Sequence, residues 1–482
     1  MIPSIPNPED FDVSPTNAFL PSSPPLQSLP DAYYEPWESI VKNLQGLILS
    51  KRLRGVVDDL DILTTDKLAD EGQWRRAYSV LAFITHAYIW GGDKPKERVP
   101  PTISIPFLAT CKHLDLPPVA TYSGLVLWNW KPLFPAEPID TLANLDMIDT
   151  FTGSLDEKWF YLISVAIEAR GAPTIPLMLE TISAARNNNR AVVTANLRSF
   201  AELLDELTSI LGKMYDNCDP HVFYHRLRPY LAGSKNMADA GLPNGVIFDN
   251  GGPINKQRYV QHSGGSNAQS SLIQFFDIAL SVEHRATGTK ANDEKDTKLK
   301  LPAHGPPSSN FIHDMRTYMP GAHARFLAAV AQVANTRAFV QQNRHDRELS
   351  LAFDACLAML SAFRDKHIQI VSRYIIVKSQ QAKKAAAAEK SKDGKKQVEK
   401  VNLASVADGG KKDGLKGTGG TSLIPFLRQA RDETRDGAVD AWTRRLLLKL
   451  PAPAPDVGEG VHEQGLAGVW GKDDSLGGLC RY

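Results

Sequence analysis

One histidine of this chain lies within the apolar face of a predicted helix, where its imidazole could bind a metal. Residues 347–377 have helical periodicity, and the residues of one face follow one another at steps of three or four: Cys356, Leu360, Phe363, His367, Ile370 and Tyr374. Such a histidine is either a core residue whose ring nitrogens bond to backbone carbonyls, or an axial ligand to the iron of a flat, apolar cofactor such as haem. The spacing alone favours the core residue.

Five blocks of sequence, taken in their order along the chain, decide between these interpretations. They are Phe-Tyr-His-Arg-Leu-Arg at 223–228, Ser-Gly-Gly-Ser at 263–266, Asp-Met-Arg-Thr-Tyr-Met-Pro at 314–320, Arg-Asp-Lys-His-Ile-Gln-Ile-Val at 364–371, and Lys-Gly-Thr-Gly-Gly-Thr at 416–421. This ordered set resembles the indoleamine 2,3-dioxygenase family, the haem enzymes that open the indole ring of tryptophan. The resemblance extends over roughly residues 30 to 450.

The resemblance implies that His367 is the proximal ligand of one haem b per chain. Ser164 is then the serine of the distal, catalytic side, a weak hydrogen-bond donor and acceptor with no power as a base near neutral pH. From the pattern alone, Ser164 would be a helix serine bonded to its own backbone. Asp277, Arg364 and Ser266 match groups that the family places at the haem edge, and a surface salt bridge is the alternative for the first two.

The resemblance places the other site residues around the substrate: Tyr122, Leu125, Phe160, Tyr161, Phe223, Arg228, Gly265, Ser266, Asn267 and Thr418. Phe160, Tyr161 and Phe223 would form an apolar slot for a flat indole, although core packing also explains such aromatic residues. The planar guanidinium of Arg228 would bind the substrate carboxylate, against the alternative of a solvated arginine. Thr418 would bond to the amino-acid end of the substrate from a glycine-rich segment that closes over it.

The reaction implied by the resemblance adds both atoms of O₂ across the indole 2,3 double bond of L-tryptophan or a related indoleamine. Its product is N-formylkynurenine, and the reaction is the first step of the kynurenine route towards NAD. An electron donor would be needed to reduce ferric haem. Tyr161 and Asn267 depart from the phenylalanine and the small residue that are usual in the family. A second hypothesis therefore stays open, namely a haem-binding relative of low activity that acts as a sensor or a signalling scaffold.

The elements that must position these residues are predicted to be helices. Apolar residues recur at helical spacing from about residue 33 to 90 and again from about residue 155, with prolines breaking the stretch between them. Asp219 followed by Pro220 is typical of a helix N-cap and first helical position. We expect an all-α fold with a small, mainly helical domain over 31–150 and a large helical, haem-binding domain over 151–450.

Three segments are expected to pack loosely. Residues 1–30 are rich in Pro, Ser and Asn, a composition that predicts an unstructured N-terminal tail. Residues 378–415 hold lysine runs and an alanine block, which indicate a mobile, solvated insertion with helix in its first turns; a nuclear-import or polyanion-binding patch is the alternative. Residues 451–482 follow alternating prolines and alanines and are predicted to form a C-terminal tail.

Two other motifs suggest different chemistry. Cys218, His221 and His225 have the spacing C-x₂-H-x₃-H, which leaves a three-ligand zinc site as a competing hypothesis. The glycine-rich segment 417–421 has only a superficial likeness to a phosphate-binding loop, because no Lys-Ser or Lys-Thr follows it and no strand precedes it.

Composition limits the class of protein. The chain has 482 residues, enough to bury a large core, and its 55 basic against 54 acidic residues give no broad positive field that would attract nucleic acid. The four cysteines are scattered, as in proteins with reduced thiols. There is no secretory signal and no apolar run of about 20 residues. We therefore expect a cytoplasmic monomer that contacts neither membrane nor nucleic acid.

Overall fold

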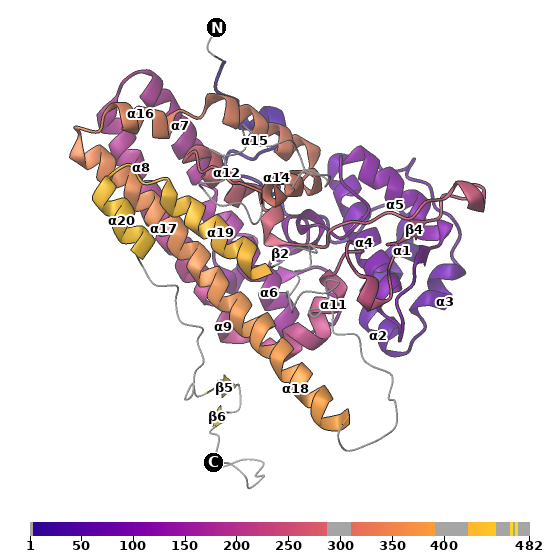
Figure 1. Ribbon diagram of the computed structural model, residues 1–482. Helices are drawn as coiled ribbons and strands as arrows, with labels where there is room; N and C mark the ends of the chain where they lie inside the picture. The colour runs from indigo at the N-terminus through magenta and orange to yellow at the C-terminus, as the bar shows by residue number, and fades with distance from the viewer. Residues whose placement is uncertain (1–2, 287–309, 391–422, 450–462, 466–467, 471–482) are drawn as a thin grey trace, which may run out of the picture.

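The computed structural model describes residues 3–286, 310–390, 423–449, 463–465 and 468–470. Helices dominate these residues, which confirms the all-α prediction, and the strands form short pairs. Figure 1 shows a small lobe that contains α1 to α5 beside a large lobe that contains α6 to α20. The boundary between two domains near residue 150 stays a prediction.

The small lobe is built around α4, whose residues are buried almost throughout. The side chain of Asp70 begins this helix by accepting the backbone N–H of Gln73, as an N-cap residue does. The helices of the small lobe are η2 Ala32–Tyr34, α1 Glu35–Lys42, α2 Leu44–Leu49, α3 Leu53–Asp58, α4 Glu71–Trp90 and α5 Pro101–His113.

The strands of the described residues form three pairs. They are parallel β1 Arg98–Val99 with β4 Ile247–Phe248, antiparallel β2 Trp130–Pro132 with β3 Leu145–Met147, and antiparallel β5 Glu463–Gly465 with β6 Gly468–Trp470.

The large lobe is organised by two long helices, α8 and α17, which pack along each other. Its α-helices are α6 Leu155–Gly171, α7 Thr174–Arg186, α8 Arg190–Gly212, α9 Met214–Asn217, α10 Pro220–Val222, α11 Arg228–Leu231, α12 Ser271–Ala279, α14 Phe311–Asp314, α15 Gly321–Val333, α16 Thr336–Gln342, α17 Arg347–Val371, α18 Lys378–Lys390, α19 Leu423–Asp436 and α20 Ala441–Lys449. In the part of the chain that the structure describes, three segments are π-helices: η3 Ser123–Leu127, η5 Phe223–Leu227 and η11 Ser372–Val377. Short 3₁₀ turns are η1 Pro8–Phe11, η4 Leu142–Asn144, η6 Ala238–Ala240, η7 Ile254–Lys256, η8 Asn267–Gln269 and η10 Met315–Tyr318.

Two local predictions about helices are confirmed. Asp219 caps α10 by accepting the N–H groups of His221 and Val222, and Pro220 is the first helical residue. The first turns of the lysine-rich insertion are helical as α18, which projects from the end of α17 in Figure 1. The rest of that insertion and most of the C-terminal tail lie outside the described residues.

The prediction of a loose N-terminal tail is wrong for residues 3–30. Phe19 and Leu20 are buried, and the Phe19 ring lies edge-on to Phe326 of α15 with a centroid distance of 6.0 Å. Phe11 also contacts Phe326, at 5.8 Å. The segment is polar on average, but its few apolar side chains bury their surface against a helix that lies about 300 residues away in sequence, which composition cannot show.

One helical stretch among the described residues, Leu155–Arg186, is long and apolar enough to cross a membrane by length and composition, although charged residues interrupt it. This stretch comprises α6 and α7, and 78% of its most apolar window is buried inside the structure. Its hydrophobicity is therefore explained by its place in the protein core.

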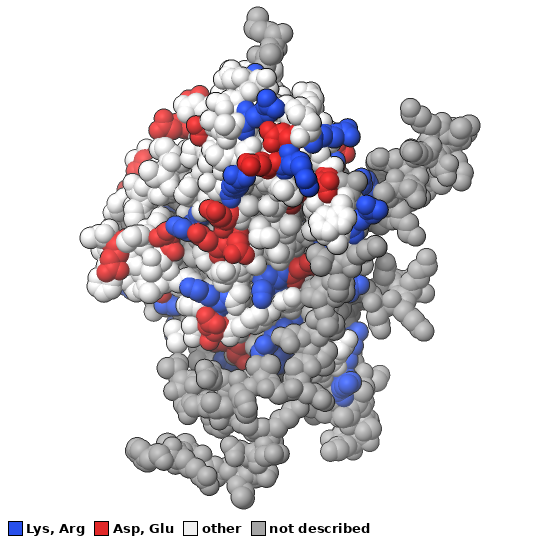
Figure 2. All heavy atoms as spheres, turned by 90° about the vertical axis from the view of Figure 1, so that its left-hand side faces the viewer, with Lys and Arg blue, Asp and Glu red and all other residues white. Residues whose placement is uncertain are grey.

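Acidic and basic side chains are interspersed on the face shown in Figure 2, which lies on the α16 and α20 side of Figure 1. An example of an exposed pair in the large lobe is Arg198 with Glu348, which joins α8 to α17 at 3.0 Å while both side chains are more than half exposed. The charges on this face are thus mixed, as the near-zero net charge of the sequence leads one to expect.

Candidate active site

The residues predicted for the site converge on one cavity. Its walls come from η3, α6, η5, α11, the loop 263–270, α12, α14, α17, η11 and α19, and apolar side chains provide most of its lining. The predicted residues that line it are Tyr122, Leu125, Phe160, Tyr161, Ser164, Phe223, Arg228, Gly265, Ser266, Asn267, Asp277, Arg364 and His367. Thr418 lies outside the described residues, so its role stays a prediction.

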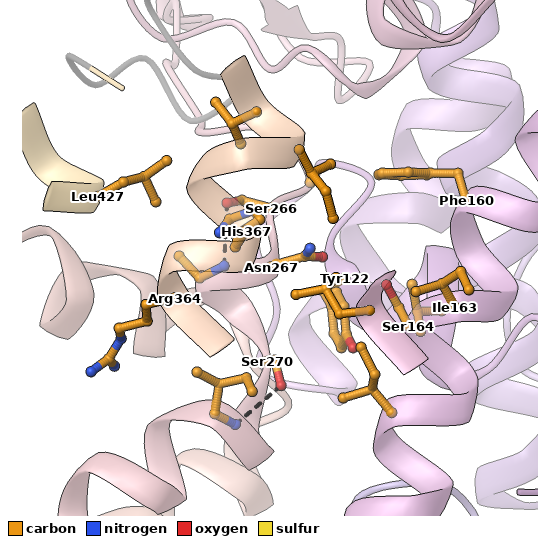
Figure 3. A pocket seen from close by; sticks show the side chains of 18 of the residues that line it. Tyr122, Phe160, Ile163, Ser164, Ser266, Asn267, Ser270, Arg364, His367 and Leu427 are labelled. Atoms are coloured by element: carbon orange, nitrogen blue, oxygen red, sulfur yellow. Dashed lines mark hydrogen bonds between the residues drawn. The ribbon is translucent and has the colours of Figure 1, made fainter. Parts of the chain in front are cut away.

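His367 faces the cavity from α17, as Figure 3 shows. Burial and the nearby Arg364 cation lower its pKa to about 4, so the imidazole is neutral at physiological pH. No hydrogen bond to this ring is found within the described part of the chain. His86 shows what a satisfied core histidine looks like, with Nδ1 2.7 Å from the carbonyl oxygen of Tyr230 and Nε2 accepting the N–H of Ala120 at 2.8 Å. His367 lacks the bonds that the core interpretation requires.

The wall opposite His367 is apolar apart from hydroxyl groups. Ser164 lies there on α6, across the cavity from α17 in Figure 3. The Phe223 ring lies 4.9 Å from Phe160 and 5.7 Å from Tyr374, measured between centroids. These rings pack against one another and give this wall an apolar aromatic surface, which suits a flat aromatic ligand.

Tyr161 is buried in the same wall. Its hydroxyl forms no hydrogen bond with good geometry among the described residues, yet it lies close to the carboxyl group of Glu157. Burial and that carboxyl group both raise the pKa of Tyr161, so the hydroxyl is neutral. Tyr161 therefore contributes an aromatic surface with no charge.

Three walls of the cavity share one backbone irregularity, the π-helix. Leu125 lies in η3, Phe223 in η5 and Tyr374 in η11, and all three line the cavity. A π-turn is an α-helical turn that holds an extra residue, and such turns occur frequently at functional sites. Periodicity in the sequence does not reveal η5 and η11, because an α-helix continues on both sides of each.

The loop that carries Ser266 and Asn267 is held by close backbone packing. A Cβ atom on Gly264 would lie 2.1 Å from the carbonyl oxygen of Leu231, and one on Gly233 would lie 2.2 Å from that of His262. Both contacts are impossible for a residue with a side chain. The two glycines thus allow the loop to pack against the C-terminal end of α11, the short helix that begins at Arg228.

Arg228 is buried, with only 3% of its surface exposed, so it is not a solvated arginine. Its guanidinium carbon lies 5.7 Å from the centre of the Tyr224 ring. Burial lowers the pKa of Arg228 to about 10, which still leaves the side chain positively charged at neutral pH. A cation thus reaches a cavity whose lining is mostly apolar.

Asp277 and Arg364 form a buried ion pair, not a surface salt bridge. Nη2 of Arg364 donates to both carboxylate oxygens of Asp277, at 2.6 and 2.7 Å, and the two side chains are 11% and 5% exposed. Burial alone would raise the pKa of Asp277, but the cations of Arg364 and His284 hold it at about 2. This edge of the cavity is therefore charged.

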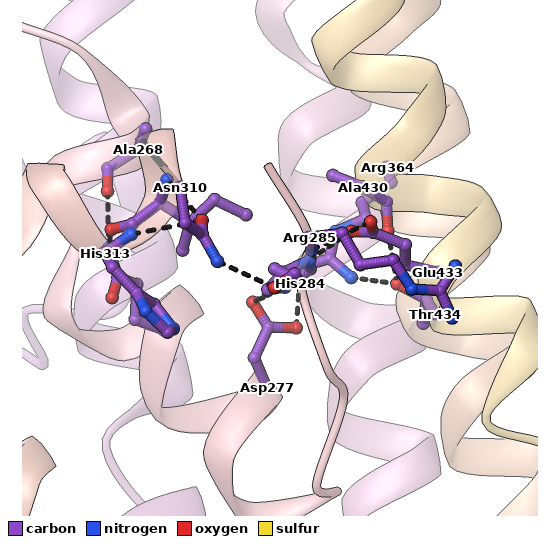
Figure 4. A network of polar contacts seen from close by, with 12 residues as sticks. Ala268, Asp277, His284, Arg285, Asn310, His313, Arg364, Ala430, Glu433 and Thr434 are labelled. Carbon is purple, nitrogen blue, oxygen red and sulfur yellow. Dashed lines mark hydrogen bonds and ion pairs between the residues drawn. The ribbon is translucent and has the colours of Figure 1, made fainter. Parts of the chain in front are cut away.

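His284 extends that pair to α19, as Figure 4 shows. Its Nε2 lies 3.0 Å from a carboxylate oxygen of Asp277, and its Nδ1 lies 2.7 Å from one of Glu433. Burial opposes the charged form, yet the two carboxylates raise the pKa of His284. The backbone N–H of Arg285 also donates to Glu433, at 3.0 Å. We missed His284 and Glu433 in the sequence because no motif joins them.

Residues of α19 complete the cavity and were also missed. Leu423, Phe426 and Leu427 line it, directly after the glycine-rich segment 417–421. The helix has apolar side chains at steps of three and one and a strongly polar opposite side, a pattern that predicts packing against the large lobe. That pattern could have identified α19 as part of the site.

The zinc hypothesis is not supported. The rings of His221 and His225 lie 4.4 Å apart, but no three His, Cys, Asp or Glu side chains among the described residues could hold a metal together. Cys218 is buried, and its carbonyl oxygen accepts a hydrogen bond from Tyr374 at 2.6 Å. The Cys218 segment therefore supports the wall of the cavity.

Comparisons with known proteins agree with this geometry. The model of the family described as indoleamine 2,3-dioxygenase matches residues 7–437. An indoleamine 2,3-dioxygenase of Saccharomyces cerevisiae is 40% identical over 437 residues, covering 88% of this chain and 92% of the relative. The 6-hydroxytryptophan 2,3-dioxygenase fscD of Fusarium equiseti is 38% identical, covering 89% and 96%. Indoleamine 2,3-dioxygenase 1 of Mus musculus is 33% identical, covering 87% and 92%.

Proposed function

Because the chain belongs to the indoleamine 2,3-dioxygenase family, we propose that it is a haem enzyme that adds both atoms of O₂ across the indole 2,3 double bond of L-tryptophan, giving N-formylkynurenine. The observation that carries this proposal is the neutral imidazole of His367. Its ring faces a mostly apolar cavity and forms no hydrogen bond with the described residues. A low-activity sensor or scaffold is not favoured, because the relatives compared above are named as dioxygenases.

The residues around the cavity fit a haem. A neutral imidazole on a rigid helix is a good axial ligand for iron, and apolar walls suit the porphyrin plane. Asp277 and Arg364 provide a charged edge next to the same helix, where propionate groups would meet polar side chains. When bound, the haem would supply the iron at which O₂ is activated.

The side chains of this chain would bind and orient the substrate. Phe160 and Phe223, which pack against each other, would offer the indole a shared apolar surface, which also excludes water. Arg228 would bind the carboxylate through its buried guanidinium, where low solvent exposure strengthens the charged hydrogen bonds. Ser164 would be the polar group nearest the indole ring, and its hydroxyl is too weak a base to remove a proton.

Binding and spectroscopy test the assignment directly. The protein reconstituted with haem should show a Soret band, and His367→Ala should lose or strongly weaken it. The control is His221→Ala, which removes an exposed imidazole from the rejected zinc motif and should keep the band. An undiminished band in His367→Ala would refute the role of His367, and absence of N-formylkynurenine in the wild-type reaction would refute the activity.

Other features of the proposal rest on the sequence and the family alone. These are one haem b per chain, a monomeric and cytoplasmic protein, an electron donor for ferric haem, and a place in the kynurenine route. Family membership supports the cofactor and the substrates, tryptophan and O₂. The remaining points stay predictions.

A further inference from the structure

An amide side chain that the proposed function does not use lies in the wall of the cavity. Asn267 is the first residue of the short helix η8, and it lines the cavity. Figure 3 shows its amide group between His367 of α17 and Ser164 of α6. No hydrogen bond to this amide is found among the residues that the structure describes. Its donor and acceptor groups are therefore left for a ligand or for water.

Two other amide side chains of the same segment are used differently. Gln269 donates to the carbonyl oxygen of Gly264 at 2.9 Å and accepts a backbone N–H at 2.9 Å. Gln274 donates to the carbonyl oxygen of Ala268 at 3.0 Å and accepts the side-chain Nε–H of Arg316 at 2.7 Å. Both glutamines are buried. Their amides use both donor and acceptor to hold the loop 263–270 in place.

The backbone of Asn267 is thereby fixed, although its side chain is not bonded to the described residues. Its carbonyl oxygen accepts the N–H of Ser270 at 3.1 Å, and Oγ of Ser266 accepts the N–H of Ala268 at 3.3 Å. A polar group that is held in place before a ligand arrives loses less conformational freedom when the ligand binds. A fixed backbone with an unbonded amide is the arrangement that recognition of a ligand requires.

Such an amide discriminates between substrates by their chemistry. The benzene ring of tryptophan has only C–H groups at its edge, so an amide beside that edge would lose water and gain no hydrogen bond. A hydroxyl on the same ring can donate and accept, so it can pair with either end of the amide. A site with a polar group for a substrate hydroxyl disfavours the analogue that lacks the hydroxyl, because the polar group of the site is then left unpaired.

We propose that Asn267 is a specificity-determining residue, which favours tryptophan derivatives that carry a hydroxyl on the benzene ring of the indole. This inference rests on the proposed function and deepens it, since tryptophan itself remains a substrate that binds less tightly. In the proposed binding mode, Phe160 and Phe223 meet the face of the ring and Arg228 meets the carboxylate. Asn267 then meets the edge of the ring.

The test is anaerobic optical titration of the ferrous holoenzyme with L-tryptophans that carry one hydroxyl, on each benzene-ring carbon in turn. Each is compared with the L-tryptophan methylated at the same carbon, because a methyl group has nearly the size of a hydroxyl but forms no hydrogen bond. At least one hydroxyl derivative should bind to the wild type about tenfold more tightly than its methyl counterpart. Asn267→Leu, which keeps the size of the side chain, and Asn267→Ala should both abolish this preference.

Two controls separate recognition of the hydroxyl from a structural role. Gln261→Ala removes an exposed amide from the segment before the loop, outside the cavity lining, and should keep the preference. Unsubstituted L-tryptophan should bind to Asn267→Leu at least as tightly as to the wild type, because no amide then loses water. The kcat/KM values should show the same change of preference between wild type and variant, since the intrinsic reactivity of each compound is the same for both proteins.

Three outcomes would overturn the inference: no hydroxyl derivative preferred by the wild type, a preference that persists in Asn267→Leu and Asn267→Ala, or a preference that is lost in Gln261→Ala. Equal weakening of tryptophan and of its hydroxyl derivatives in the Asn267 variants would also overturn it, because the amide would then serve a part that all these substrates share, such as the ammonium group. The proposed function fails separately, through a missing Soret band or missing product from L-tryptophan in the wild type.

Discussion

Replacing Asp277 by Asn should destabilise the protein strongly, because it breaks the ion network at the edge of the cavity. Asp277 accepts two short hydrogen bonds from Arg364 and lies 3.0 Å from His284, and its side chain is 5% exposed. The gap between its ordinary pKa of 3.8 and a value of about 2, at about 1.4 kcal/mol per pH unit, amounts to about 2.5 kcal/mol in favour of the folded, ionised form.

The free energy of unfolding of Asp277→Asn should fall by more than the value derived from the pKa of Asp277. Asparagine keeps the shape of the side chain but leaves the cations of Arg364 and His284 buried without their shared carboxylate. Removing one partner of a buried pair typically costs about 3–5 kcal/mol. We therefore expect the free energy of unfolding of Asp277→Asn to fall by about 3 kcal/mol or more at pH 7.

Urea denaturation at pH 7, followed by tryptophan fluorescence, measures the loss. The matched control is Glu348→Gln, which breaks an ion pair whose side chains are 58% and 75% exposed and should cost less than about 1 kcal/mol. A loss in Asp277→Asn no larger than in this control would refute the reasoning. The pH dependence gives a second check: because the pKa is lowered on folding, the advantage of the wild type is complete above about pH 4 and should shrink as the pH falls towards 2.

Three further predictions concern other parts of the site. Gly264→Ala places a Cβ 2.1 Å from the backbone oxygen of Leu231 and should cost about 3 kcal/mol in a melting experiment. Gly265→Ala meets the end of the Leu125 side chain at 2.7 Å and a backbone oxygen only at 3.2 Å, so it should cost less. Arg228→Lys should lower kcat/KM for L-tryptophan about thirtyfold, and the loss should be absent for tryptamine, which has no carboxylate. The pKa of His284 is raised by folding, so its contribution is complete below its ordinary pKa of 6.5 and is lost as the pH rises through the raised pKa. Amide hydrogen exchange in α19 should then accelerate beyond the intrinsic rate as the pH rises above 6.5, and His284→Asn should abolish that excess.

Much of the site could be predicted because it depends on local patterns and ordered blocks. The position of His367 follows from a helical face, and the cap at Asp219 follows from two adjacent residues. The family resemblance then identified residues on six separate segments that the structure brings to one cavity. The chemical roles of those residues are still predictions.

Long-range contacts could not be predicted in the same way. The burial of Phe19 depends on Phe326, and the charge of His284 depends on Glu433, and neither pair shares a local motif. Glu168, a carboxyl group buried next to the cavity, did leave a signal: it is the one acidic residue in the apolar stretch that follows Ser164 along α6, where a charge would have to be buried. A search for ionisable residues on buried helix faces would have found it.

The π-turns in three walls have a consequence for how such a site can diverge. Each holds one residue more than an α-turn needs, and two of them lie between α-helices, so a single-codon deletion within 223–227 or 372–377 could leave an unbroken helix behind. The remainder of the helix would then rotate by about 100° relative to the cavity, and Phe223 or Tyr374 would be replaced by a neighbour. Changes in chain length, and not only substitutions, are thus a route by which this protein could acquire a new ligand preference while its helical framework persists.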